Sequence, residues 1–107
     1  MAIQKITAEN FQSVVLNSDK PVFVDFSATW CGPCKVYHPT FEAFAEANAD
    51  KARFAEVDID ECSEVAFKYG INAVPTTVIF SGGEPVDHVM GAVNEYTLNI
   101  LLDRVLM

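Results

Sequence analysis

Two cysteines separated by two residues, Cys31 and Cys34, are the side chains with the clearest chemistry in this sequence. Thiols this close can close a small disulfide ring and open it again. They follow an apolar run at 22–26, which predicts a buried strand, and they precede residues 36–48, whose periodicity predicts a helix. At the start of a helix, free backbone N–H groups and the helix dipole favour a thiolate. The pattern therefore predicts thiol–disulfide exchange.

The position of each cysteine predicts its role. Cys31 comes first, at the exposed start of the helix, and is the candidate nucleophile. Cys34 lies one turn further in, so we expect it to be better buried and to resolve the mixed disulfide, releasing the reduced target. A metal site is the alternative, but structural zinc normally needs four ligands, and the rest of the chain offers only Cys62, His38 and His88. We therefore expect no metal.

Asp25 is the third candidate for a chemical role, because it stands between Val24 and Phe26 inside the apolar run. Burial of an ionised carboxylate costs free energy, so the pKa of Asp25 should be raised. The alternative is an edge strand from which Asp25 reaches solvent, and the apolar neighbours disfavour it.

Three further residues shape the surface next to the thiols. Trp30 provides an aromatic wall and a contact surface. Gly32 lets a partner's backbone approach closely, and Pro33 fixes φ at the helix start.

Length and composition narrow the class of protein. A chain of 107 residues, half of them hydrophobic, predicts one globular domain over residues 1–107. The formal net charge of −8 disfavours nucleic acid and anionic membranes as direct partners. Residues 1–7 lack the apolar segment of a secretory signal, and three cysteines are few for a disulfide-stapled secreted scaffold. We therefore expect a reducing, cytoplasmic location, although removal of a targeting peptide before residue 1 stays open.

The pattern along the chain predicts an α/β domain with a mixed sheet. Thr7 should cap the first helix, Pro39 should kink the second, Gly70 should stop the third and Asn94 should cap the last. The expected strands cover residues 3–6, 22–26, 53–58, 76–80 and 85–90, and the expected helices cover 8–17, 36–48, 63–69 and the segment after Asn94.

Three pieces of the sequence, at residues 24–35, 74–76 and 91–92, closely resemble the thioredoxin family. The resemblance implies the thioredoxin fold, a five-stranded mixed sheet flanked by four helices. It also implies a monomeric protein-disulfide reductase that acts on disulfide-containing proteins and is re-reduced by a thioredoxin reductase with NADPH. No bound cofactor is implied beyond the redox-active disulfide Cys31–Cys34. The stretch 27–29 resembles the eukaryotic cytosolic branch more than the bacterial one.

The resemblance also implies roles for individual residues. Asp25 matches the proton acceptor and donor for the buried cysteine. Pro75 matches the family's cis-proline, which lies against the disulfide and presents the backbone of Val74 to the substrate chain. Gly91 and Ala92 match the remaining rim of the substrate groove; an ordinary tight loop before a helix is the alternative for these two.

The sequence departs from the family pattern at a few positions. Glu56 stands where many bacterial thioredoxins have a lysine near the buried aspartate, and a second carboxylate should raise the pKa of Asp25 further. His38 is either a solvated side chain or a counter-charge near Asp25. Cys62 should be a buried free thiol, because Tyr69 stands where some animal members have the partner of a regulatory disulfide.

Two other functions remain as alternatives. A thioredoxin fold can serve as a binding subunit or chaperone whose thiols are secondary, which the dithiol beside Pro75 argues against. A disulfide oxidase or isomerase is disfavoured by the lack of a secretory signal and by the Gly32-Pro33 pair.

Overall fold

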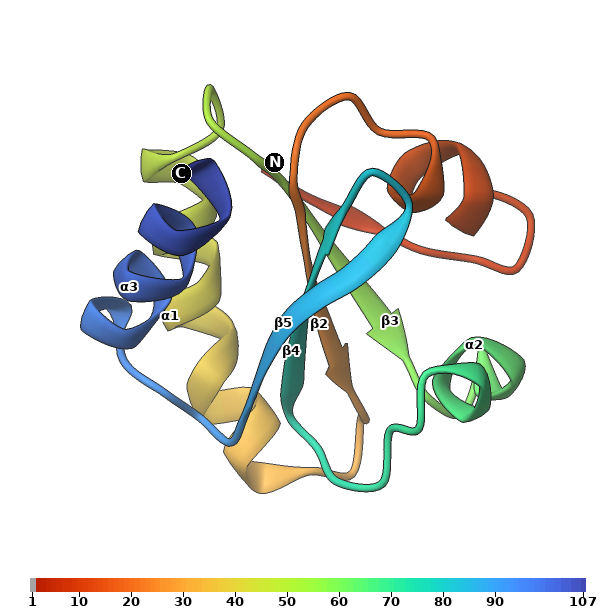
Figure 1. The fold of residues 1–107 in the computed structure, drawn as a ribbon. Helices are drawn as coiled ribbons and strands as arrows, with labels where there is room; N and C mark the ends of the chain where they lie inside the picture. The colour runs from red at the N-terminus through yellow and green to blue at the C-terminus, as the bar shows by residue number, and fades with distance from the viewer. Residues whose placement is uncertain (1) are drawn as a thin grey trace.

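A five-stranded mixed sheet forms the centre of the computed structural model, which describes residues 2–107. The strands lie in the order β1-β3-β2-β4-β5 (Figure 1). β1, β3 and β2 run parallel, whereas β4 is antiparallel to β2 and β5 to β4, which confirms the mixed sheet. The strand bounds are β1 (Ile3–Lys5), β2 (Val22–Ser27), β3 (Arg53–Asp58), β4 (Thr76–Ser81) and β5 (Glu84–Met90).

Helices cover both faces of the sheet. α1 (Gly32–Ala47) and α3 (Glu95–Leu106) lie side by side on one face, and α2 (Ser63–Lys68) lies on the other with η1 (Gln12–Leu16), a single π-helical turn. The thioredoxin fold expected from the sequence is therefore confirmed.

The central strand β2 has apolar side chains on both faces, as a strand covered on both sides requires. Val22, Val24 and Phe26 pack towards η1 and α2, whereas Phe23 packs towards α1 and α3. Because successive side chains alternate, Asp25 shares the face of Phe23 and lies beneath α1.

The first helical segment differs from the expected helix over residues 8–17. Residues 8–10 form turns, and the Asn17 N–H donates to the carbonyl of Gln12 at 2.9 Å, a bond that spans five residues. The expectation that Thr7 caps this helix was wrong, because the N-cap of η1 is Phe11. Thr7 stabilises the preceding turn instead: its Oγ1 accepts from the Asn10 N–H at 3.2 Å, and Asn10 Oδ1 accepts from the Thr7 N–H at 2.7 Å.

The other helices begin and end close to the expected positions. α1 starts at Gly32, four residues before the expected segment, and continues through Pro39. Gly70 has a φ of +68° and ends α2, and the Ile71 N–H donates to the carbonyl of Ala66 at 3.0 Å. The kink at Pro39 stays a prediction.

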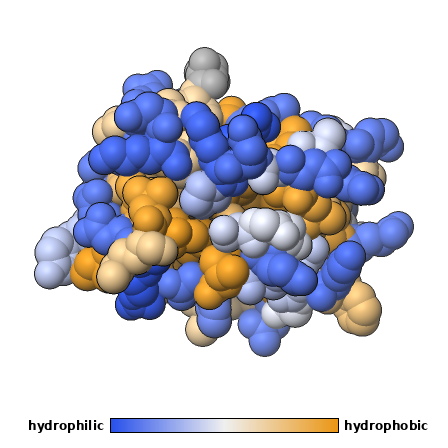
Figure 2. Space-filling model, turned by 45° about the horizontal axis from the view of Figure 1, so that its top comes forward, coloured by the Kyte–Doolittle hydropathy of each residue, from blue (hydrophilic) through white to orange (hydrophobic). Residues whose placement is uncertain are grey.

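Hydrophilic side chains dominate the face shown in Figure 2, with smaller hydrophobic areas between them. Among residues 2–107, no helix combines the length and the apolar composition needed to cross a membrane.

Candidate active site

The two cysteines form a disulfide at the start of α1, with their Cα atoms 5.3 Å apart. Cys31 is the N-cap residue of the helix, and its Sγ accepts a hydrogen bond from the Cys34 N–H at 3.2 Å. Gly32 and Pro33 occupy the first turn, and a Cβ placed on Gly32 would meet no atom within 4 Å. The backbone therefore supports negative charge on Cys31 and leaves open space above Gly32.

The expected difference in burial between the cysteines is absent in this disulfide form. Each residue is 5% exposed, so the prediction that Cys34 is better buried was wrong here. Both cysteines belong to one small buried cluster with Ala28, against which Ile59 and Val74 pack. The surroundings still differ, because Cys31 faces the backbone of Val74 and Cys34 faces a pocket that contains Asp25.

The loop before β4 lies against Cys31. The Val74–Pro75 peptide bond is cis, and the carbonyl oxygen of Val74 is 3.7 Å from Cys31 Sγ. The Gly91 N–H donates to the Pro75 carbonyl at 2.8 Å, which connects the end of β5 to this loop. The structure therefore places Val74 against Cys31 and joins Gly91 to the same loop through Pro75, and Ala92 is an exposed neighbour of Gly91.

Trp30 lies beside the disulfide with 66% of its surface exposed. Its indole Nε1–H donates to Asp60 Oδ2 at 2.9 Å, and the Asp60 N–H in turn donates to Asp58 Oδ1 at 2.8 Å. This pair of bonds orients the indole while leaving its surface available for contact. The role of Asp60 was missed, because the two partners are 30 residues apart and no local pattern joins them.

Asp25 is 1% exposed, and its Oδ1 has no hydrogen-bond partner among the described residues. Burial raises the pKa of Asp25 to about 7, and the nearby charge of Glu56 adds to the increase. Glu56 on β3 and Thr77 on β4 are its register neighbours. The hydroxyls of Thr77 and Tyr37 are hydrogen-bonded to each other at 2.8 Å. The burial and both predicted causes of the raised pKa are confirmed.

A pocket of about 300 Å³ connects Asp25 to the surface. Cys34 and Asp25 line it together with Glu56 and His38. His38 Nδ1 lies 3.4 Å from Glu56 Oε2, so His38 contacts the neighbouring carboxylate. His38 is thus a partly exposed side chain beside Glu56, and its action as a counter-charge for Asp25 stays a prediction.

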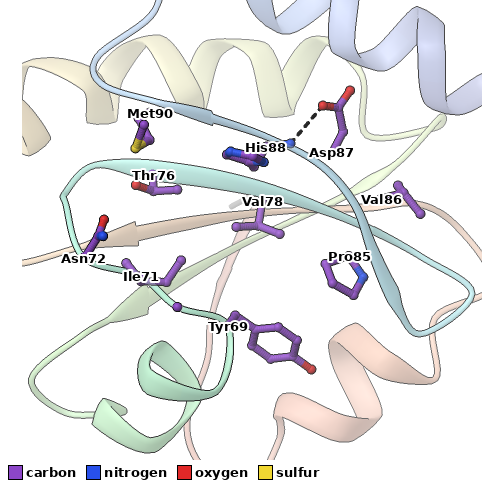
Figure 3. A pocket seen from close by; sticks show the side chains of 11 residues that line it. Tyr69, Ile71, Asn72, Thr76, Val78, Pro85, Val86, Asp87, His88 and Met90 are labelled. Carbon is purple, nitrogen blue, oxygen red and sulfur yellow. Dashed lines mark hydrogen bonds between the residues drawn. The ribbon is translucent and has the colours of Figure 1, made fainter.

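The third cysteine and the second histidine lie away from the disulfide. Cys62 is a buried free thiol, as expected, 3.6 Å from the carbonyl of Ile6, and burial is the main cause that raises its pKa. His88 lines a larger pocket, of about 630 Å³, between β5 and the segment from Tyr69 to Asn72 (Figure 3). Neither Cys31, Cys34 nor Asp25 lines that pocket. Across residues 2–107, no group of three or more His, Cys, Asp or Glu side chains is placed to hold a metal ion.

Known proteins with this arrangement were found by sequence and by structure. A model of the thioredoxin family matches residues 2–104. Thioredoxin 1 of Nostoc sp. is 43% identical over 96% of both chains. The chloroplastic thioredoxin M4 of Arabidopsis thaliana is 41% identical over 98% of this chain, which spans only 54% of that protein. The crystal structure of Malassezia sympodialis thioredoxin matches with a TM-score of 0.87 and 40% identity, covering 95% of this chain and 89% of that one.

Proposed function

The chain belongs to the thioredoxin family and is a thiol–disulfide oxidoreductase, and on that premise we propose that Cys31 attacks protein disulfides and Cys34 resolves them. The observation that carries this assignment is the different surroundings of the two sulfurs. Cys31 Sγ accepts a hydrogen bond from the Cys34 N–H at the positive end of α1 and lies beside the carbonyl of Val74. Cys34 shares a pocket with Asp25, a group able to take its proton.

The reaction then proceeds in two exchanges. The Cys31 thiolate attacks one sulfur of the substrate disulfide, and the other substrate sulfur leaves as a thiolate. Asp25 takes the proton of the Cys34 thiol, and the Cys34 thiolate attacks Cys31 Sγ. This step forms the Cys31–Cys34 disulfide, and the second substrate sulfur leaves as a thiolate that takes up a proton. The dithiol is thereby oxidised by two electrons and the substrate is reduced.

The surface around Cys31 is the proposed binding site for the substrate chain. Its support is the exposed indole of Trp30, the open space above Gly32 and the cis Val74–Pro75 loop bonded to Gly91. The full proposed set is Trp30, Gly32, Pro33, Val74, Pro75, Gly91 and Ala92.

The partners and the location are also proposals. We assign re-reduction to a thioredoxin reductase with NADPH, and we expect a cytoplasmic monomer of the eukaryotic cytosolic branch. The stretch 27–29 supports that branch. The comparisons support only the wider family, because the Nostoc and chloroplastic relatives are at least as similar to this chain as the Malassezia thioredoxin is. Fractionation of the source cells is the test of location.

Insulin reduction with NADPH and thioredoxin reductase tests the function. We expect the protein to precipitate the insulin chains, and Cys31→Ser to abolish the reaction. Cys62→Ser removes a cysteine outside the site and is the matched control. A binding subunit would leave insulin soluble, and full activity of Cys31→Ser would contradict the assignment of the nucleophile.

Cys34→Ser provides the second arm, because it removes the resolving thiolate. We expect a stable mixed disulfide with the substrate, which mass spectrometry of tryptic peptides would place on Cys31. An adduct on Cys62 in its place would contradict the roles assigned here.

A further inference from the structure

We propose that His38 is a positioning residue that acts through Glu56 on Asp25, so that protonation of His38 helps Asp25 to release its proton. The inference rests on the proposed function, in which Asp25 exchanges a proton with Cys34. It concerns how this chain sets the pH range of that exchange.

The first support is the arrangement of three side chains on one pocket. Asp25 comes from β2, Glu56 is its register neighbour on β3, and His38 comes from α1, one helical turn after Cys34. His38 Nδ1 and Glu56 Oε2 are 3.4 Å apart. The side chains of His38 and Glu56 are 44% and 32% exposed, whereas Asp25 is 1% exposed. The group that meets solvent is thus linked to the buried carboxylate by Glu56.

The second support is the electrostatics of this line of groups. The negative charge of Glu56 opposes ionisation of Asp25 and contributes to its raised pKa. A protonated imidazole beside Glu56 offsets that charge, and a neutral imidazole does not. Histidine is the residue type whose charge ordinarily changes near neutral pH. The ionisation of Asp25 should therefore depend on the charge state of His38.

Other charged groups also face the pocket. Lys5 on β1 lines it as the register neighbour of Glu56 and is paired with Glu61 at 3.2 Å, and Lys35 on α1 is exposed. Asp58 on β3 lines the pocket as a further carboxylate. From the β4 side, Asp25 meets Thr77, whose hydroxyl is bonded to Tyr37, and burial raises the pKa of Tyr37 so that it stays neutral.

The sign of the effect follows from these charges. When His38 carries a proton, its charge offsets that of Glu56, so Asp25 ionises more readily. When His38 is neutral, the full charge of Glu56 acts on Asp25, which then holds its proton more tightly. The charge state of His38 and the ionisation of Asp25 are therefore coupled, and the Asp25 titration of the unsubstituted protein should be broad.

Carbon-13 NMR titration of the Asp25 carboxyl in the oxidised protein tests the inference directly. His38→Lys keeps a positive charge at all relevant pH values, and His38→Gln has none. We expect the lowest Asp25 midpoint in His38→Lys, the highest in His38→Gln and an intermediate, broader titration in the unsubstituted protein. In this order, the Asp25 midpoint should change by roughly half a pH unit from one protein to the next, as expected for charges separated by partly solvated protein.

Two controls show whether the effect passes through Glu56. In a Glu56→Gln background, the His38 substitutions should shift the Asp25 midpoint much less. Lys35→Gln removes a different positive charge from the rim of the same pocket, and it should shift the midpoint less than His38→Gln does. Equal shifts from Lys35 and His38, or a His38 effect that persists without Glu56, would overturn the inference.

The inference also predicts the kinetics of the second exchange, in which the Cys34 thiolate attacks Cys31 Sγ. Stopped-flow measurement of the resolving step should give pH profiles in the same order as the NMR midpoints. Identical Asp25 titrations in all three proteins, each folded as judged by thermal unfolding, would also overturn the inference. Insulin reduction by the unsubstituted protein would still stand in that case, so the two failures are distinguishable.

Discussion

At the scale of single residues, the two active-site sulfurs are distinguished by what they face and not by how exposed they are. The Cys34 N–H supports charge on Cys31 Sγ, and Asp25 and Cys34 line one pocket. A backbone donor stabilises a thiolate permanently, whereas a carboxyl group with a pKa of about 7 can hold or release a proton near neutral pH. The first suits the attacking thiol, and the second suits the resolving thiol.

Asp25→Asn should stabilise the fold at neutral and alkaline pH. Because the pKa of Asp25 is about 7 in the folded protein and near 4 when unfolded, the folded state binds more protons between these values. Its stability therefore falls as pH rises from about 4 to about 7, by roughly 4 kcal/mol at most. The amide in the Asp25→Asn variant does not ionise, so the variant avoids this loss of stability. The cost of burying an unpaired N–H group reduces the gain.

Urea unfolding of the oxidised protein at about pH 4 and about pH 8 measures the effect. The free energy of unfolding of Asp25→Asn should exceed that of the unsubstituted protein by a small amount at the lower pH and by a large amount at the higher pH. Equal gains at both pH values would show that the pKa of Asp25 is not raised.

Local sequence was sufficient to identify Cys31, Cys34 and the burial of Asp25. In each case the deciding feature was the type of the neighbouring residues. The Trp30–Asp60 and Tyr37–Thr77 hydrogen bonds could not be predicted in the same way, because each joins residues at least 30 positions apart. The contact of His38 with Glu56 also depends on how α1 lies over β3.

At the scale of elements, β2 and α1 carry the site, and each was predictable for a different reason. β2 is apolar nearly throughout, and α1 has one apolar stripe. The helix expected over residues 8–17 forms only as the π-helical turn η1, and its buried Val14 and Val15 fit the period of either type of helix. α1 begins at Gly32, before the predicted segment 36–48, and this start agrees with the placement of Cys31 and Pro33 at the beginning of the helix.

The cap of α3 provides a test at this scale. Asn94 Oδ1 accepts from the Thr97 N–H at 3.1 Å, so Asn94→Ala leaves that donor without its partner. We expect a loss of about 1 kcal/mol in the free energy of unfolding. Asn94→Ser keeps an oxygen at the cap and is the matched control. Equal losses in both variants would indicate a role for Asn94 other than capping.

At the scale of the whole molecule, the negative charge acts on every encounter with a substrate. The net charge is −8, and Asp58, Asp60 and Glu61 lie on the segment that holds Trp30. Such a surface attracts cationic disulfides and repels anionic ones over about 10 Å at moderate salt.

Reduced protein should therefore react faster with cystamine than with glutathione disulfide, once each rate is divided by that of free dithiothreitol. The difference should shrink as sodium chloride is raised, because salt screens the surface charge. Stopped-flow recording of thiol oxidation gives both rate constants. A normalised preference that does not change with salt would mean that local fit, not charge, sets these rates.

The two ends of the chain have a practical consequence for isolating partners. In Figure 1, the chain enters β1 and leaves α3 at the end of the molecule opposite to the start of α1. A tether attached at either end would therefore hold the molecule to a solid support with the disulfide facing the solution. Beads carrying Cys34→Ser in this orientation should capture disulfide-containing proteins as covalent adducts, and dithiothreitol would then elute them for identification.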